Sequence, residues 1–244
     1  MSAEALRQVV DGENVQLFEQ MARAIDQGDR EAILALVSAH PETLHEYTFF
    51  CGKTWLGYAA GQGALTAVRT LVEAGADVNQ GGKYESTAAI CWAAKGHEDV
   101  VRFLLEQGAR LDTATQAANP LFWAVSHWEK PDQTEIVLML LRAGIDSRVI
   151  YPYKSRKKPK AGLDAVSKAF LWGTPTKAGV VAAWNCRHRP EEIRSVLEAA
   201  QLASSTHVPQ IKLSPEKKIQ QDEKIRLLLE KAYDAAMRTL PVIE

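Results

Sequence analysis

The stretch GALTAVRTLVEAGADVN at residues 63–79 and the stretch GHEDVVRFLLEQGARLD at residues 96–112 share one frame of glycine and apolar positions. In each stretch the first glycine is followed by a valine after five positions, a leucine after eight and a second glycine after twelve. The second frame lies 33 positions after the first. A fixed step of this size indicates stacked supersecondary units, each of which buries its apolar face against its neighbours. The sequence therefore predicts an array of helix pairs.

Helix start and stop signals surround the first of these frames. Thr54 precedes a helical stretch and can accept a hydrogen bond from a free backbone amide, which predicts an N-cap. Gly63 and Gly75 fit the left-handed conformation that ends a helix. The apolar face of the second helix, which we expect to meet the core, consists of Val68, Leu71 and Val72.

The Thr-x-Leu opening at residues 54–56 and the GADVN ending at residues 75–79 closely resemble the ankyrin repeat, which opens with TPLH and ends with GADVN. Trp55 takes the place of the proline, and we expect its large ring at the helix start to be partly exposed. Asn119 and Pro120 give another match, as cap and first helical residue. The resemblance implies an all-α fold, an ankyrin-repeat solenoid of about 4–5 helix pairs with N- and C-terminal capping helices.

The repeat pattern predicts an ankyrin array over residues 1–200 and a linker with a C-terminal capping helix over residues 201–244. Within the array, the units lie near residues 14–46, 47–79, 80–113 and 114–150, followed by a basic loop at 151–162 and a degenerate unit at 163–200. Thr174-Pro175 signals the first helix of the degenerate unit, and residues 191–200 are its expected second helix. Ser214-Pro215 signals the start of the capping helix.

Composition narrows the class of protein. The chain has 244 residues and a net charge of −1, so no overall field favours nucleic acid or an anionic membrane. No apolar run approaches the roughly 18 residues of a spanning helix, and the first residues lack the pattern of a secretory leader. Cys51, Cys91 and Cys186 are too widely spaced for a disulfide framework or a metal knuckle. We therefore expect a cytoplasmic protein with reduced thiols.

Motifs for catalysis are missing from the sequence. It contains no phosphate-binding GxxxxGK[ST] loop, no HExxH and no GxSxG. Gly57, Gly61 and Gly63 fall in a predicted helix and turn with no strand before them, which argues against a dinucleotide site. We expect no enzyme activity, cofactor, metal or small-molecule substrate. An active site in residues 150–213, which carry the weakest repeat signal, stays open as an alternative.

The ankyrin resemblance also implies where a partner binds, namely the concave face made of the hairpin tips and the exposed ends of the first helices. Transferred to this sequence, the predicted partner-binding residues are Phe50, Lys53, Gln62, Lys83, Tyr84, Ser86, Lys95, Gln116, His127 and Trp128. The set combines aromatic, cationic and amide side chains. It predicts a protein partner with an acidic or mixed surface, bound by a chain that is monomeric when free.

Several functions fit this expectation. Small solitary ankyrin proteins resemble bacterial immunity or antitoxin proteins, which block a toxin by covering it. An adaptor or a host-directed effector is the alternative form of the same protein-binding role. The basic run at residues 154–160 leaves open a different class, a binder of nucleic acid or of a membrane surface.

Overall fold

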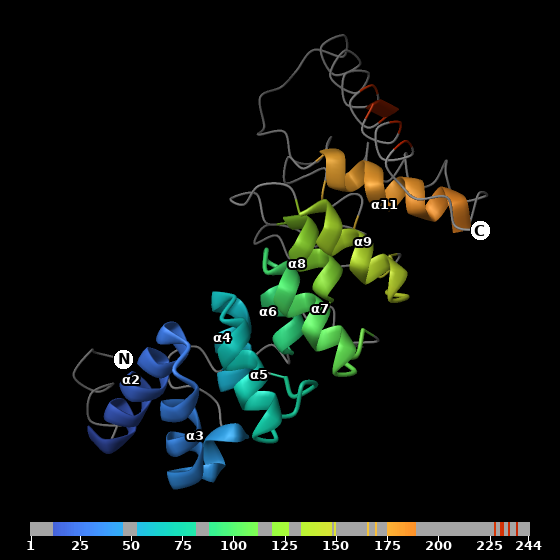
Figure 1. Ribbon diagram of the computed structural model, residues 1–244. Helices are drawn as coiled ribbons and strands as arrows, with labels where there is room; N and C mark the ends of the chain where they lie inside the picture. Colours follow the sequence, from blue (N-terminus) through green and yellow to red (C-terminus); the bar gives the residue numbers. More distant parts are fainter. Residues whose placement is uncertain are drawn as a thin grey trace, which may run out of the picture. The chain divides into compact units, whose positions relative to one another are not determined.

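The computed structural model (Figure 1) describes residues 12–45, 53–81, 88–111, 119–126, 133–147 and 175–188. It also describes single positions at 149, 165, 169, 227, 230, 231, 234 and 238. The regular elements formed by these residues are all helices, which agrees with the predicted all-α class. The chain divides into two compact units, Met1–Ala93 with Asp99–Ala109 and Ala94–Glu98 with Arg110–Glu244.

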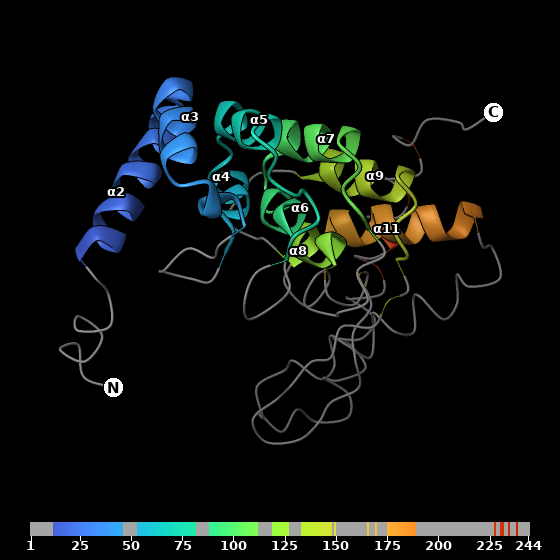
Figure 2. The same ribbon diagram turned by 90° about the horizontal axis from the view of Figure 1, so that it is seen from below.

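The first unit is built of helix pairs. Its elements are α2 (Gly12–Gln27), α3 (Arg30–Ala39), the short 3-10 helix η1 (Pro41–Leu44), α4 (Trp55–Gln62), α5 (Leu65–Glu73), α6 (Ala89–Ala93) and α7 (Glu98–Glu106). The helices α2 and α3 pack together, as do α4 and α5, while α3 also packs on α5 and α4 on α6. Figure 2 shows two rows, with α2, α4 and α6 in one and α3, α5 and α7 in the other.

The ends of α4 are set by the residues that the sequence indicated. The backbone amide of Gly57 donates to the Thr54 hydroxyl at 3.0 Å, so Thr54 is the N-cap. Gly63 ends the helix with φ 72°, and Gly75 follows α5 with φ 104°. Side chains with a Cβ rarely adopt these angles, which explains the glycine at both turns. The predicted cap and both predicted helix stops are confirmed.

The core of the first unit lies between the two rows of helices. In α5, Val68 and Leu71 are buried as expected, whereas Val72 is half-buried. In α3, Ile33 and Val37 are buried and continue the same row. Each second helix buries one face, as its amphipathic pattern predicts.

Trp55 corrects one expectation from the sequence. We expected its ring to be partly exposed at the start of α4, but the residue is only 6% exposed. Its ring centroid lies 5.2 Å from that of Phe18 in α2 and 5.8 Å from that of Tyr58 in α4. The preceding repeat supplies Phe18, whereas Tyr58 belongs to the same helix as Trp55. The first pair of rings is tilted and the second is edge-to-face, an arrangement in which aromatic rings attract each other. The first residue of α4 therefore faces α2 instead of solvent.

The second unit contains α8 (Pro120–Ser126), α9 (Thr134–Arg142) and α11 (Pro175–His188). The helix α9 packs on both α8 and α11. The Asn119 side chain accepts a hydrogen bond from the Leu121 amide at 2.9 Å, which confirms its capping role. The helix α11 starts at Pro175, as the Thr-Pro signal predicted, and its middle is buried at Val180, Val181, Ala182 and Ala183.

Several predicted segments fall outside the described residues. They are the basic run at 154–160, the expected helix at 191–200 and nearly all of residues 201–244. In the predicted capping helix, the described single positions are helical, and Leu227 is 45% exposed. The unit boundaries that the repeat pattern gave stay predictions. In the part of the chain that the structure describes, no helix has the length and apolarity needed to cross a bilayer.

Candidate interaction surface

An aromatic residue occupies the fourth position of each of the helices α4, α6 and α8. These residues are Tyr58, Trp92 and Trp123. All three are half-buried. Each is followed by a fully buried alanine, namely Ala59, Ala93 and Ala124. The first helices of successive repeats therefore pair a small core residue with a large ring that is partly open to solvent.

In the first unit, Trp92 lies between a lysine and the glycines of α4. The Lys53 ammonium stands over the Trp92 ring, 3.8 Å from its centroid. A Cβ added at Gly57 would lie 3.3 Å from Trp92 Cδ1, and one added at Gly61 would lie 3.6 Å from Trp92 Cβ. The two glycines thus leave room for the indole on the surface of α4. Their place on α4 is therefore explained by packing against Trp92.

In the second unit, the same kind of contact is made by different residues. The Lys95 ammonium stands over the Trp123 ring, 4.3 Å from its centroid. A cation above an aromatic ring is attracted by the ring quadrupole, and the contact contributes on the order of 0.5–1 kcal/mol at an exposed site. Both lysines are half-buried, because their stems lie against the rings. Each unit therefore holds a positive charge in a defined position beside a first helix, with Lys53 just before α4 and Lys95 in the turn after α6.

A buried polar network lies beside the Lys95–Trp123 pair. Gln133, which precedes α9, donates from Nε2 to the Lys95 carbonyl at 2.7 Å. Its Oε1 accepts from Lys177 Nζ at 3.2 Å, and Lys177 Nζ also donates to the Ala124 carbonyl at 2.9 Å. Gln133 is 4% exposed and Lys177 is 5% exposed. These bonds connect α8, α9 and α11 to the turn that holds Lys95.

Comparison with known families identifies the helix pairs as repeats of a known type. The family model described as ankyrin repeats (3 copies) matches residues 21–115 and residues 82–150, and the two matches together cover more than half of the chain. The chain belongs to the ankyrin-repeat family. Ankyrin repeats are non-catalytic modules that bind proteins, so the repeats of this chain are a protein-interaction module.

Two proteins resemble part of this ankyrin chain. Palmitoyltransferase Hip14 of Drosophila melanogaster is 34% identical over 126 residues, which are 50% of this chain and 19% of that protein. The putative palmitoyltransferase ZDHHC13 of Danio rerio is 34% identical over 113 residues, which are 45% of this chain and 16% of that protein. The chain thus spans less than a fifth of each of these relatives. Both relatives are named as palmitoyltransferases.

Of the predicted partner-binding residues, the structure describes Lys53, Gln62 and Lys95. Gln62 is exposed at the end of α4, and its Nε2 lies 3.5 Å from the Tyr58 hydroxyl. Lys53 and Lys95 are each placed on a tryptophan, as described above. The predicted contacts that lie outside the described residues are Phe50, Lys83, Tyr84, Ser86, Gln116, His127 and Trp128. The assignment of the whole set as a binding face stays a prediction.

Sequence reasoning did not pair Trp92 and Trp123 with lysines. It also passed over Gln133 and Lys177. A signal for Lys177 was present in the sequence, because Thr174-Pro175 aligns with Asn119-Pro120. That alignment places Lys177 where α8 carries the buried Phe122.

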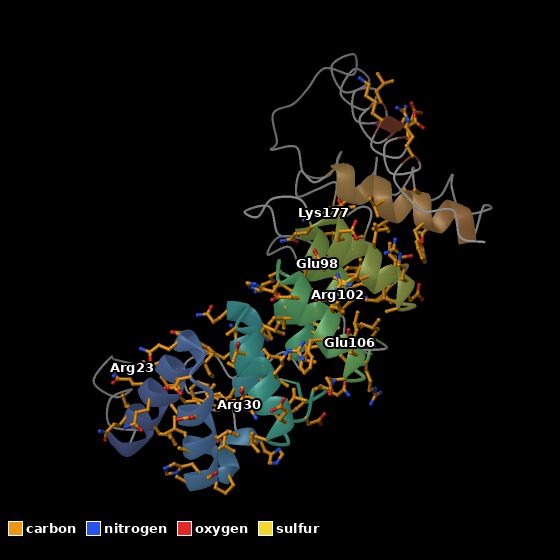
Figure 3. The ribbon with its side chains drawn as sticks, in the orientation of Figure 1. Arg23, Arg30, Glu98, Arg102, Glu106 and Lys177 are labelled. Carbon is orange, nitrogen blue, oxygen red and sulfur yellow. The ribbon has the colours of Figure 1, made fainter. Side chains whose placement is uncertain are left out.

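The second helices of this ankyrin chain carry a different kind of surface. Arg30 in α3 and Glu73 in α5 form an ion pair at 2.6 Å, with both side chains about half-exposed. Along α7, Glu98, Arg102 and Glu106 are exposed at four-residue spacing, and Figure 3 shows their places on the helix. Charges of both signs on these helices favour a solvated surface. Among the described residues, no group of histidine, cysteine, aspartate and glutamate side chains is arranged to hold a metal ion.

Proposed function

We propose that this chain is a non-catalytic adaptor that captures a protein partner through the surface of its first helices and hairpin tips. The supporting observation is the position of Lys53 over Trp92 and of Lys95 over Trp123. An ordered ammonium beside a partly open ring can bind a carboxylate while the ring contacts apolar atoms next to it. Tryptophan and other aromatic residues are also the side chains on which binding energy concentrates at interfaces.

The partner in this proposal is a protein with an acidic or mixed surface. Lysine ammonium groups bind carboxylates through charge-assisted hydrogen bonds, which contribute on the order of 1.5–3 kcal/mol each. Charge complementarity of this kind also accelerates association and suppresses partners of the wrong sign. We propose further that the chain is monomeric when free and acts in the cytoplasm, where a buried cysteine such as Cys91 stays a reduced thiol.

The test is affinity capture from the lysate of the source organism, with quantitative mass spectrometry of the bound proteins. The variant Lys53→Met with Lys95→Met removes the two cations that stand over Trp92 and Trp123. The control Arg102→Met with Arg142→Met removes the same charge from exposed positions on α7 and α9. We expect the lysine variant to lose its specific partner by about tenfold or more in affinity, because at least one charged contact is removed. The arginine control should capture that partner at the level of the unmodified chain.

The result that contradicts this proposal is equal capture by the lysine variant and the unmodified chain. Thermal unfolding of both variants shows whether a loss of capture reflects a loss of folding. A salt titration separates a protein partner from the alternative of nucleic acid bound by residues 154–160, since phosphate binding weakens steeply with salt.

An immunity or antitoxin role is a second form of the same proposal. In that form the captured protein is a toxin, and the chain inhibits it by covering its surface. We place the adaptor first because neither of the two similar proteins is named as an inhibitor. Inhibition of the captured protein's own activity by an equimolar amount of this chain distinguishes the inhibitor from the adaptor.

A further inference from the structure

Lys177 occupies a position that is neutral in the other first helices. It is the third residue of α11, and the third residues of α4, α6 and α8 are Gly57, Cys91 and Phe122. All four are buried. Figure 3 labels Lys177 in the region of the second unit where α8, α9 and α11 come together. A lysine is almost never fully buried unless its ammonium is paired or hydrogen-bonded, so the burial of Lys177 depends on the partners of its ammonium.

The ammonium of Lys177 binds to the end of α8. The Ala124 carbonyl, which accepts from Nζ at 2.9 Å, lies in the last turn of that helix. Carbonyls in the last turn have no amide partner within the helix. A cation at this end also interacts favourably with the helix dipole. Lys177 therefore fixes the backbone of α8 next to Trp123.

The same ammonium also acts on Lys95, through Gln133. The Gln133 amide accepts from Lys177 at 3.2 Å and donates to the Lys95 carbonyl at 2.7 Å. An amide side chain can do both because its oxygen accepts and its nitrogen donates. Gln133 makes these bonds and does not cap α9, since its side chain makes no capping bond there. The orientation of the Gln133 amide is thus fixed by its two partners.

Both residues of the Lys95–Trp123 pair are consequently held through hydrogen bonds to backbone carbonyls. Lys95 is bound through its own carbonyl, and Trp123 is bound through the carbonyl of the next residue. We propose that Lys177 is a positioning residue that couples the docking of α11 to the geometry of the Lys95–Trp123 pair. The consequence for partner binding rests on the proposed function, whereas the coupling itself does not. A partner that binds the ordered pair should in turn stabilise the docked α11, because coupling between two sites is reciprocal.

A second side-chain contact of α11 provides a matched control. The hydroxyl of Ser147, which follows α9, donates to Oδ1 of Asn185 in α11, and both residues are buried. This bond attaches α11 to the same repeat without touching Gln133, Lys95 or Ala124. The substitution Ser147→Ala weakens the attachment of α11 and leaves the polar network intact.

The experiment is ¹⁹F NMR of the full chain labelled with 5-fluorotryptophan, in the absence of any partner. The variant Trp123→Phe assigns the Trp123 resonance, and Lys95→Met gives its position when the cation above the ring is removed. The variant Lys177→Met deletes the ammonium. The variant Gln133→Glu keeps an acceptor for Lys177 but cannot donate to the Lys95 carbonyl, so it interrupts the network while α11 retains its charged contact.

We expect the Trp123 resonance to shift toward its Lys95→Met position in both Lys177→Met and Gln133→Glu. In Ser147→Ala it should stay at the position of the unmodified chain, and the Trp92 resonance should stay in place in all three variants. The proposal is overturned if Trp123 stays in place in Gln133→Glu, a variant that retains Lys177. It is also overturned if Ser147→Ala shifts Trp123 as far as Lys177→Met does, because Lys177 would then act only through the stability of α11. Since no partner is present, these outcomes do not depend on whether the proposed adaptor function is correct.

Discussion

Alanine substituted separately at Gly57 and Gly61 tests whether α4 is shaped to receive the indole of Trp92. Both glycines lie in α4 and both approach Trp92, so the same change is made at two places against one ring. Neither glycine has a positive φ, so alanine brings no backbone strain at either site. The helix propensity of alanine is more favourable than that of glycine by up to about 1 kcal/mol, and both variants gain this contribution.

The space available to the added methyl group differs between the two sites. At Gly57 a Cβ would lie 3.3 Å from both Thr54 Oγ1 and Trp92 Cδ1, which is tighter than an ordinary contact. At Gly61 the nearest atom would be Trp92 Cβ at 3.6 Å, an ordinary van der Waals contact. Overpacking costs roughly 1–3 kcal/mol. Because the propensity gain is shared, the free energy of unfolding of Gly57→Ala should be lower than that of Gly61→Ala by roughly 1–3 kcal/mol. The free energy of unfolding of Gly61→Ala should be higher than that of the unmodified chain by about 0.5–1 kcal/mol.

The assay is urea denaturation followed by far-ultraviolet circular dichroism, with the unmodified chain measured alongside. Equal slopes for the three proteins are required, because a changed slope signals a loss of two-state behaviour and not a simple change in stability. The packing of Trp92 on α4 is refuted if Gly57→Ala unfolds at the same or a higher urea concentration than Gly61→Ala.

Three further predictions concern the stability of the first unit. Leu71→Ala should lower the free energy of unfolding by about 2–5 kcal/mol, because Leu71 is 1% exposed and its loss leaves a cavity; a loss below about 1 kcal/mol in urea denaturation would contradict its place in the core. Thr54→Ala should cost about 0.5–2 kcal/mol through loss of the N-cap, and amide exchange in α4 should accelerate; unchanged exchange at the Gly57 amide would count against the cap. A double-mutant cycle on Arg30 and Glu73 should give an interaction free energy of at most about 1 kcal/mol that shrinks with added salt, because both side chains are half-exposed; a salt-independent value above that range would show that the pair is shielded from solvent.

Much of the fold could be predicted because its signals act over short stretches of chain. Thr54 and Asn119 cap their helices through bonds to amides two or three residues away. Gly63 and Gly75 end their helices through a backbone angle that depends on one residue. A reader of the sequence needs only the local order of residues to find these features, and the repeat step of 33 then predicts how the helices are paired.

The candidate surface could be predicted only in outline. The sequence placed Lys53 and Lys95 on the predicted binding face, but it gave no reason to join them to Trp92 and Trp123. The first pair joins residues 39 positions apart and the second joins residues 28 positions apart. Contacts between residues so far apart in the sequence depend on how neighbouring repeats align, and a single repeat does not specify that alignment.

The positions of the main helices, their ends and the family follow from the order of residues along the chain, because backbone hydrogen bonds and turn angles are satisfied locally. The places of individual large and charged side chains depend on how the repeats pack. Trp55 became a core residue because Phe18 of α2 packs against its ring. Lys177 became a buried connection because the Ala124 carbonyl of α8 and the amide oxygen of Gln133, which precedes α9, both accept from its ammonium. Burial is a property of the surroundings of a residue, and those surroundings exist only after the repeats have stacked.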